Sequence, residues 1–121
     1  MSENINQEEL KAAETAAEET TEGVYVHILS RPVTLLVGSE QKTVDRLNFD
    51  FDKLTGRDSL AVEREMQSLG IPLMVKEFSG DYQLRVAARA CSEKIGSDVL
   101  AELPMKDYNR ILGRTRSFLL K

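Results

Sequence analysis

The chain has 121 residues, of which 41% are hydrophobic and 30% charged, and its formal net charge is −4. These values fit a single globular domain and exclude a chain that is disordered throughout. No apolar run approaches the roughly 18 residues of a membrane-spanning helix and no signal peptide precedes the domain, so we expect a protein of the cytoplasm that does not contact membranes.

Residues 1–23 form the first segment and carry most of the negative charge. They hold seven glutamates against Lys11 alone, a net of −6, and only Ile5 and Leu10 are large apolar side chains. Such a composition does not bury enough surface to offset the entropy lost on ordering. We predict a flexible acidic tail with helix propensity over about residues 7 to 20, and a single globular domain over residues 24–121. The tail is either a solubilising segment or a dedicated binding arm.

Residues 24–52 have the composition of a β-hairpin. Strand-forming runs flank a Gly-Ser break, and Leu47, Phe49 and Phe51 alternate with polar residues, which is typical of a strand with one buried face. The pattern predicts a turn over residues 38–41. Pro32 has no N–H to donate, so it should lie at an edge, a bulge or a break.

Residues 55–121 have helical periodicity. Thr55 and Asp58 have the spacing of a capping box, which predicts a helix from there to Leu69 that ends before Gly70. Its buried face should hold Val62, Met66 and Leu69. Residues 71–78 form a short apolar connection that is either a loop or a helical turn.

A second helix, the central one of the bundle, is predicted over residues 80–94 with Ser79 as its N-cap. Its apolar stripe comprises Leu84, Ala87, Ala88, Cys91 and Ile95. Gly96 should follow it as the C′ residue, and Ser97 should cap a short helix that runs through Leu103.

The last predicted helix starts at Pro104 and runs to near the C-terminus. Its apolar stripe comprises Tyr108, Ile111, Leu112, Thr115, Phe118 and Leu119. The fold class is therefore predicted to be α+β, with an N-terminal β-hairpin followed by a helical bundle of about four helices, helix being dominant.

Few residues in the sequence suggest chemistry. Asp50 and Asp52 occupy the first two ligand positions of a calcium loop, but the remaining positions of that motif fail, so both should lie on the solvent face of a strand. His27 is isolated within a strand and Cys91 lies on an apolar stripe, which favours structural roles. We predict no catalytic residue, no cofactor and no metal site, and hence no enzyme.

The surface of the last helix offers candidate partner-binding residues. Lys106, Arg110, Arg114 and Lys121 recur at near four-residue spacing with Arg116 nearby, and form either a solvated face or a docking strip for an acidic partner. Phe118, Leu119 and Leu120 are consecutive, and a helix cannot turn all three toward one core. At least one of these three side chains should be exposed or covered by a partner.

The C-terminal half has a recognisable order of features. An Ala-rich helix leads to Leu-Pro, then to Asp-aromatic, then to a helix that finishes in Phe-Leu. In this respect residues 82–119 resemble the tail assembly chaperones of long-tailed bacteriophages, particularly the Mu-like group with contractile tails. The upstream phrase LNFDFDKLTGRDSLAVE resembles the strand and helix start of that family, so the resemblance covers residues 24–121. The matching positions are Ala88, Ala90, Leu103, Pro104, Asp107, Tyr108, Phe118 and Leu119.

The resemblance implies a non-enzymatic protein that binds the phage tape measure protein, assists tail-tube assembly in the bacterial cytoplasm and leaves the finished virion. The tail-tube protein and a second copy of the chain are further possible partners. One alternative is a permanent structural tail or head-joining protein. Another is a helix-turn-helix regulator in which residues 97–120 bring Arg110, Arg114 and Arg116 to DNA; the net acidic charge and the apolar stripe argue against it and against nucleic acid as a partner.

Overall fold

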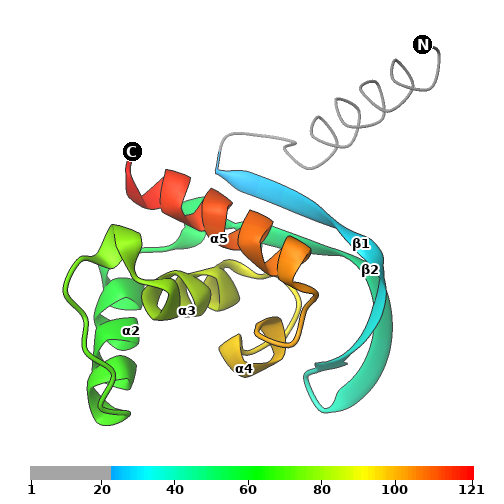
Figure 1. Cartoon of the computed structure of the whole chain (residues 1–121), viewed down its shortest axis with the longest axis horizontal. Coiled ribbons are helices and arrows are strands. Elements are labelled where there is room, and N and C mark those ends of the chain that lie inside the picture. The colour runs from blue at the N-terminus through cyan, green and yellow to red at the C-terminus, as the bar shows by residue number, and fades with distance from the viewer. Residues whose placement is uncertain (1–22) are drawn as a thin grey trace.

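The computed structural model describes residues 23–121 and has an α+β fold, as predicted (Figure 1). A two-stranded antiparallel hairpin precedes four α-helices in this part of the chain. The predicted acidic tail lies outside the described residues except for Gly23. The elements in chain order are β1 (Val24–Val37), β2 (Glu40–Asp50), the short 3-10 helix η1 (Phe51–Lys53), α2 (Gly56–Ser68), the short 3-10 helix η2 (Lys76–Phe78), α3 (Gly80–Ala90), α4 (Ser97–Leu100) and α5 (Met105–Leu119).

The hairpin turns where the Gly-Ser break predicts. Val37 lies opposite Glu40, so the loop contains only Gly38 and Ser39. Gly38 has a φ of 65°, and no non-glycine residue between 23 and 121, Ser39 included, has a positive φ, which is the pattern of a type II′ turn. The Gly38 N–H donates to the carbonyl oxygen of Lys94 at 2.8 Å. This hydrogen bond attaches the tip of the hairpin to the segment after α3.

The prediction for Pro32 is also confirmed, because β1 is bulged around it. Ile28 lies opposite Arg46 and Val33 lies opposite Val44, so β1 advances five residues while β2 advances two. The irregular stretch accommodates a residue without an N–H.

Helix α2 begins after Thr55, and both hydrogen bonds of the predicted capping box are present. At its other end Gly70 has a φ of 71°, and Ile71 N–H donates to the Met66 carbonyl oxygen at 2.9 Å, as in a Schellman motif. The prediction that Leu69 lies on the buried face is wrong. Leu69 is the C-cap residue and is 58% exposed, because the chain reverses after it and Ile71 packs near Met66 instead.

Helix α3 ends at Ala90, four residues before its predicted end. Cys91 leaves the helix and forms an antiparallel bridge with Phe49, and Ser92 N–H donates to the Asn48 carbonyl oxygen at 2.7 Å. This pairing provides a hydrogen-bond partner for the edge of β2 that does not face β1. Helix propensity is a local property and does not reflect such a long-range contact.

The early end of α3 changes the roles of the residues that follow. Gly96 is the N-cap of α4 rather than the C′ residue of α3, and Ser97 is the first residue of α4 rather than its cap. Helix α4 ends at Leu100 and does not continue to Leu103. Pro104 is the N-cap of α5, one residue outside the helix that it was predicted to start. The connection over residues 71–78 is a loop with one helical turn, η2.

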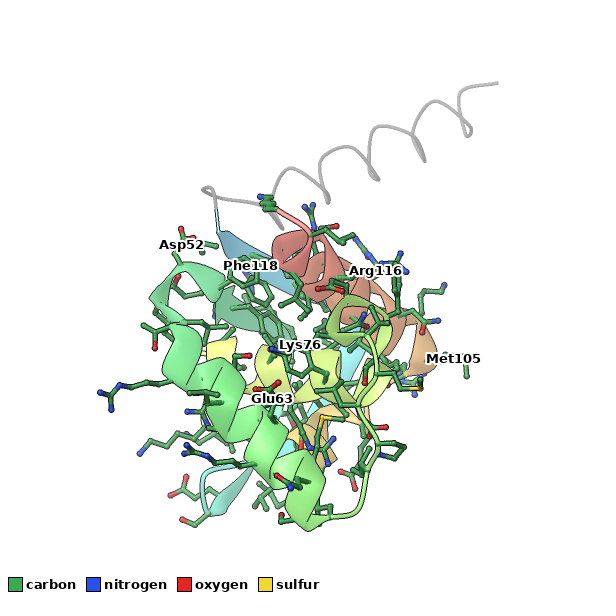
Figure 2. The ribbon with its side chains drawn as sticks, turned by 90° about the vertical axis from the view of Figure 1, so that its left-hand side faces the viewer. Asp52, Glu63, Lys76, Met105, Arg116 and Phe118 are labelled. Atoms are coloured by element: carbon green, nitrogen blue, oxygen red, sulfur yellow. The ribbon has the colours of Figure 1, made fainter. Side chains whose placement is uncertain are left out.

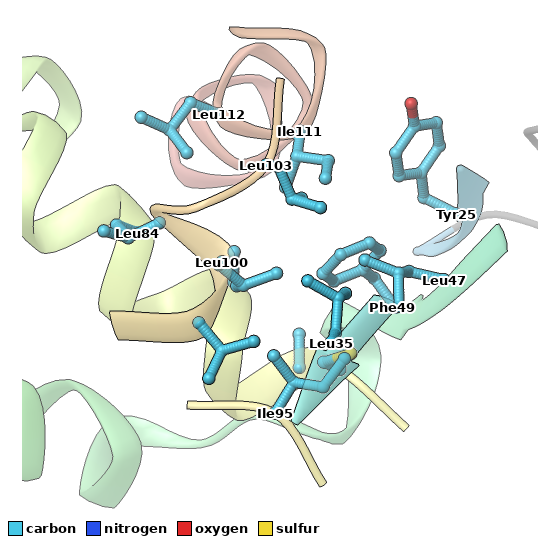
Figure 3. Close-up of a cluster of buried hydrophobic side chains, with 14 of the residues drawn as sticks. Tyr25, Leu35, Leu47, Phe49, Leu84, Ile95, Leu100, Leu103, Ile111 and Leu112 are labelled. Carbon is cyan, nitrogen blue, oxygen red and sulfur yellow. The ribbon is translucent and has the colours of Figure 1, made fainter. Parts of the chain in front are cut away.

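The main core lies between the hairpin and the helices α3, α4 and α5 (Figure 3). Leu47 and Phe49 of β2 are fully buried there. A smaller cluster lies between α2 and α3 and comprises Val62, Met66, Tyr82 and Val86. Helix α3 contributes to both clusters, which confirms its prediction as the central helix. Its Ala87 and Ala90 are fully buried, which allows close packing.

Candidate partner-binding site

The C-terminal end of α5 gathers most of the predicted partner-binding residues. Ile111, Leu112 and Thr115 of its stripe are buried, whereas Phe118 and Leu119 are half-buried. Leu120, the C-cap residue, is 59% exposed. This distribution confirms that the helix does not turn all three consecutive apolar side chains into the core.

Phe118 is fixed by an aromatic stack. Its ring lies 5.2 Å from that of Phe51, which in turn lies 6.2 Å from that of Phe49 (centroid distances). Leu119 packs against the smaller cluster between α2 and α3. The two side chains therefore anchor the end of α5 to both parts of the core, and little rotamer freedom remains for a partner to remove.

An open cavity of about 200 Å³ lies beside these two side chains; we call it the apolar cavity. It is formed by α5, by α3 and by the start of α2. The residues that line it are Leu54, Thr55, Gly56, Asp58, Ser59, Tyr82, Val86, Phe118 and Leu119. Its wall is mainly aliphatic and aromatic, with the Ser59 and Tyr82 hydroxyls hydrogen-bonded to each other. Such a surface accepts apolar side chains.

A second, smaller hollow of about 40 Å³ lies beside Phe118; we call it the basic hollow. It is lined by Gly23, Val24, Tyr25, Phe51, Arg114, Ser117, Phe118 and Lys121. The guanidinium of Arg114 lies 5.1 Å from the centre of the Tyr25 ring, a cation–π distance. Phe118 therefore separates an apolar site from a cationic one.

The predicted basic strip is present in part. Lys106 and Lys121 are exposed, and Arg110 and Arg114 are half-buried. Arg116 does not belong to it, because it lies two residues after Arg114, and two residues correspond to about 200° of rotation around an α-helix. Figure 2 shows Arg116 and Phe118 on opposite sides of α5. We therefore define the basic face of α5 as Lys106, Arg110, Arg114 and Lys121.

A buried polar network holds the other end of α5 against β1. Nε2 of His27 lies 2.8 Å from Oδ1 of Asp107, and Nδ1 lies 2.6 Å from the Tyr25 hydroxyl. Ser30 donates to Asp107 from its N–H at 2.9 Å and from its hydroxyl at 2.7 Å. Burial opposes ionisation of Asp107, but the hydrogen bonds from Ser30 and His27 outweigh it and lower the pKa of this carboxyl.

The geometry of this network indicates a structural role. The exposed fractions of His27, Asp107 and Tyr25 are 0%, 1% and 3%, so the atoms that could exchange protons are enclosed. The sequence indicated a structural role for His27 but not its partner, because Asp107 lies 80 residues away. The network orients α5 and thereby places the candidate site at its far end.

The other side chains that could carry chemistry do not come together at one site. Burial raises the pKa of the Cys91 thiol to about 12. Asp52 is exposed as predicted, whereas Asp50 is only half-exposed and has one enclosed carboxylate oxygen. Glu63 pairs with Lys76 at 3.1 Å, a contact visible in Figure 2. Within residues 23–121 no group of three His, Cys, Asp or Glu side chains could hold a metal ion.

No family model, curated protein or solved structure matches this chain. Across the described residues, no helix combines the length and apolar character needed to cross a membrane. Three residues that complete the apolar cavity were not predicted from the sequence, namely Leu54, Tyr82 and Val86. The only signal for them was their apolar character, which core residues share.

Proposed function

We propose that this protein is a non-enzymatic tail assembly chaperone of a long-tailed bacteriophage, which binds the tape measure protein and assists tail-tube assembly in the host cytoplasm. The observation that carries the proposal is the apolar cavity lined by Phe118 and Leu119, together with the exposed Leu120 that follows them in the chain. The resemblance of residues 82–119 to the phage chaperones supplies the identity of the partner.

The geometry suits an amphipathic helix as the bound segment. A partner helix presents apolar side chains at i, i+3 and i+4, and the apolar cavity, lined by Tyr82, Phe118 and Leu119 among others, can accept an apolar side chain of this kind. Leu120 adds one exposed apolar side chain directly after Leu119. The basic face of α5 lies on the other side of Phe118, where it favours a segment with acidic residues next to its apolar stripe.

The chain contains a matched pair of leucines for the test. Leu120 and Leu69 are both C-cap residues in αR conformation, with exposed fractions of 59% and 58%. Leu120→Asp should leave the fold intact and reduce the amount of soluble, co-purifying tape measure protein from the same phage on co-expression. Leu69→Asp should not. Equal recovery of the tape measure protein with both variants would refute this site.

Two alternatives predict different observations. A permanent tail or head-joining protein would remain in purified virions, where a chaperone would be depleted. A helix-turn-helix regulator is less well supported, because α4 is only four residues long and Arg114 lies over the Tyr25 ring. A regulator would bind a defined duplex tightly and with strong salt dependence.

A further inference from the structure

The chain enters the described part of the structure at the basic hollow. Gly23 lines this hollow together with Arg114 and Lys121. Its position is fixed, because its carbonyl oxygen accepts a hydrogen bond from Phe51 N–H at 2.8 Å. The covalent connection therefore delivers residues 1–22 to the C-terminal end of α5.

The charges of the two segments are complementary. Residues 1–22 hold seven glutamates and one lysine. From residue 105 to residue 121 the only acidic side chain is Asp107, which is buried and bonded to His27 and Ser30. The surface of α5 is therefore cationic without an acidic side chain of its own.

Several other surface cations of the described part form ion pairs. Lys76 pairs with Glu63, Arg85 with Glu65 and Asp81, and Arg89 with Asp58. Within residues 23–121, Lys106 and Lys121 form no ion pair. The basic face of α5 therefore attracts an acidic ligand.

The distances allow one segment to cover this face. Helix α5 has 15 residues and is about 22 Å long. An extended chain of 22 residues spans at most about 75 Å, so residues 1–22 reach from Gly23 past Lys106. Tethering raises the effective concentration of the segment to about the millimolar range, which favours even weak contacts.

We propose that the acidic residues 1–22 dock in cis on the basic face of α5, with their last residues over the basic hollow. The segment is thus an intramolecular ligand of Lys106, Arg110, Arg114 and Lys121. This docking requires no tape measure protein, so its test is independent of the proposed function.

The test compares the full-length protein with a full-length variant in which the seven glutamates are replaced by glutamine. Backbone amide resonances of residues 105–121 and of residues 23–25 should differ between the two at low salt. The differences should vanish at about 0.5 M NaCl, where the Debye length falls to about 4 Å. The substitutions are Glu3→Gln, Glu8→Gln, Glu9→Gln, Glu14→Gln, Glu18→Gln, Glu19→Gln and Glu22→Gln.

A reciprocal pair of variants controls for the cationic side. Lys106→Gln with Lys121→Gln should reduce the salt-dependent chemical-shift differences at the other α5 amides. Lys42→Gln with Lys94→Gln, also at exposed positions, should leave these differences unchanged. Absence of the shifts, or shifts centred on another element, would overturn the proposal. Shifts that disappear on about tenfold dilution would assign the docking to a second copy instead and would equally overturn it.

Discussion

The buried carboxylate of Asp107 offers the strongest test of how α5 is held in place. It accepts hydrogen bonds from the His27 ring, from the Ser30 N–H and from the Ser30 hydroxyl. In Asp107→Ala, water can reach Ser30, which is exposed, but His27 is 0% exposed and its Nε2 loses the Asp107 carboxylate. Three hydrogen bonds to a buried carboxylate are lost and one buried ring nitrogen is left without this acceptor, which together cost about 3–5 kcal/mol.

That cost is a large part of the stability of a domain of this size, which is about 5–15 kcal/mol. Asp107→Asn keeps one acceptor oxygen, and the Ser30 hydroxyl can rotate to accept from the new amide, so its cost should be about 1–2 kcal/mol. Asp45→Ala is the control, because Asp45 is 67% exposed and its ion pair in the described part of the chain is with its exposed neighbour Arg46.

Urea unfolding followed by circular dichroism measures the three free energies. The expected order of destabilisation is Asp107→Ala, then Asp107→Asn, then Asp45→Ala, which should lie within about 0.5 kcal/mol of the wild type. A loss below about 1 kcal/mol for Asp107→Ala would refute the argument, since it would show that the network does not hold α5 against β1.

Three further outcomes follow from the structure. Folding lowers the pKa of Asp107, so the stabilising contribution of this carboxylate is complete above its unfolded pKa and is lost as the pH falls through its folded pKa. The urea concentration at the unfolding midpoint should therefore decrease when the pH is lowered below about 4, and it should decrease less in Asp107→Asn. Cys91, buried and with its pKa raised to about 12, should react with iodoacetamide at pH 8 at least about 100-fold more slowly in native than in unfolded protein; similar rates would place the thiol at the surface. Thr55→Ala removes the N-cap of α2 and should cost about 1 kcal/mol, whereas Ser117→Ala, at an exposed position within α5, should cost less; equal thermal midpoints would contradict the role of the cap.

Local signals in the sequence were sufficient for several elements. The capping box at Thr55, the turn at Gly38 and the irregularity around Pro32 each depend on conformations that neighbouring residues impose on the backbone. The three consecutive apolar residues at the end of α5 likewise required at least one exposed side chain, because side chains of adjacent helical residues point about 100° apart. The candidate site on α5 was predictable to this extent.

Other boundaries depended on distant residues and were predicted wrongly. Helix α3 ends at Ala90 because Cys91 and Ser92 pair with β2, more than 40 residues earlier in the chain. Leu69 is exposed because the chain reverses at Gly70 and brings Ile71 toward the core. In both cases tertiary hydrogen bonds and packing outweigh the fraction of a kcal/mol per residue that helix propensity supplies.

The sequence by itself determined the fold class, the N-caps of α2 and α3, the hairpin turn, and the apolar and basic residues of α5, because these follow from side-chain type and from the period of the backbone. Only the tertiary structure joined His27 to Asp107, placed Leu54, Tyr82 and Val86 around Phe118 and Leu119, and brought Gly23 beside Arg114. Cavities and buried networks are formed by residues far apart in the chain, and their positions depend on how whole helices pack rather than on any local pattern.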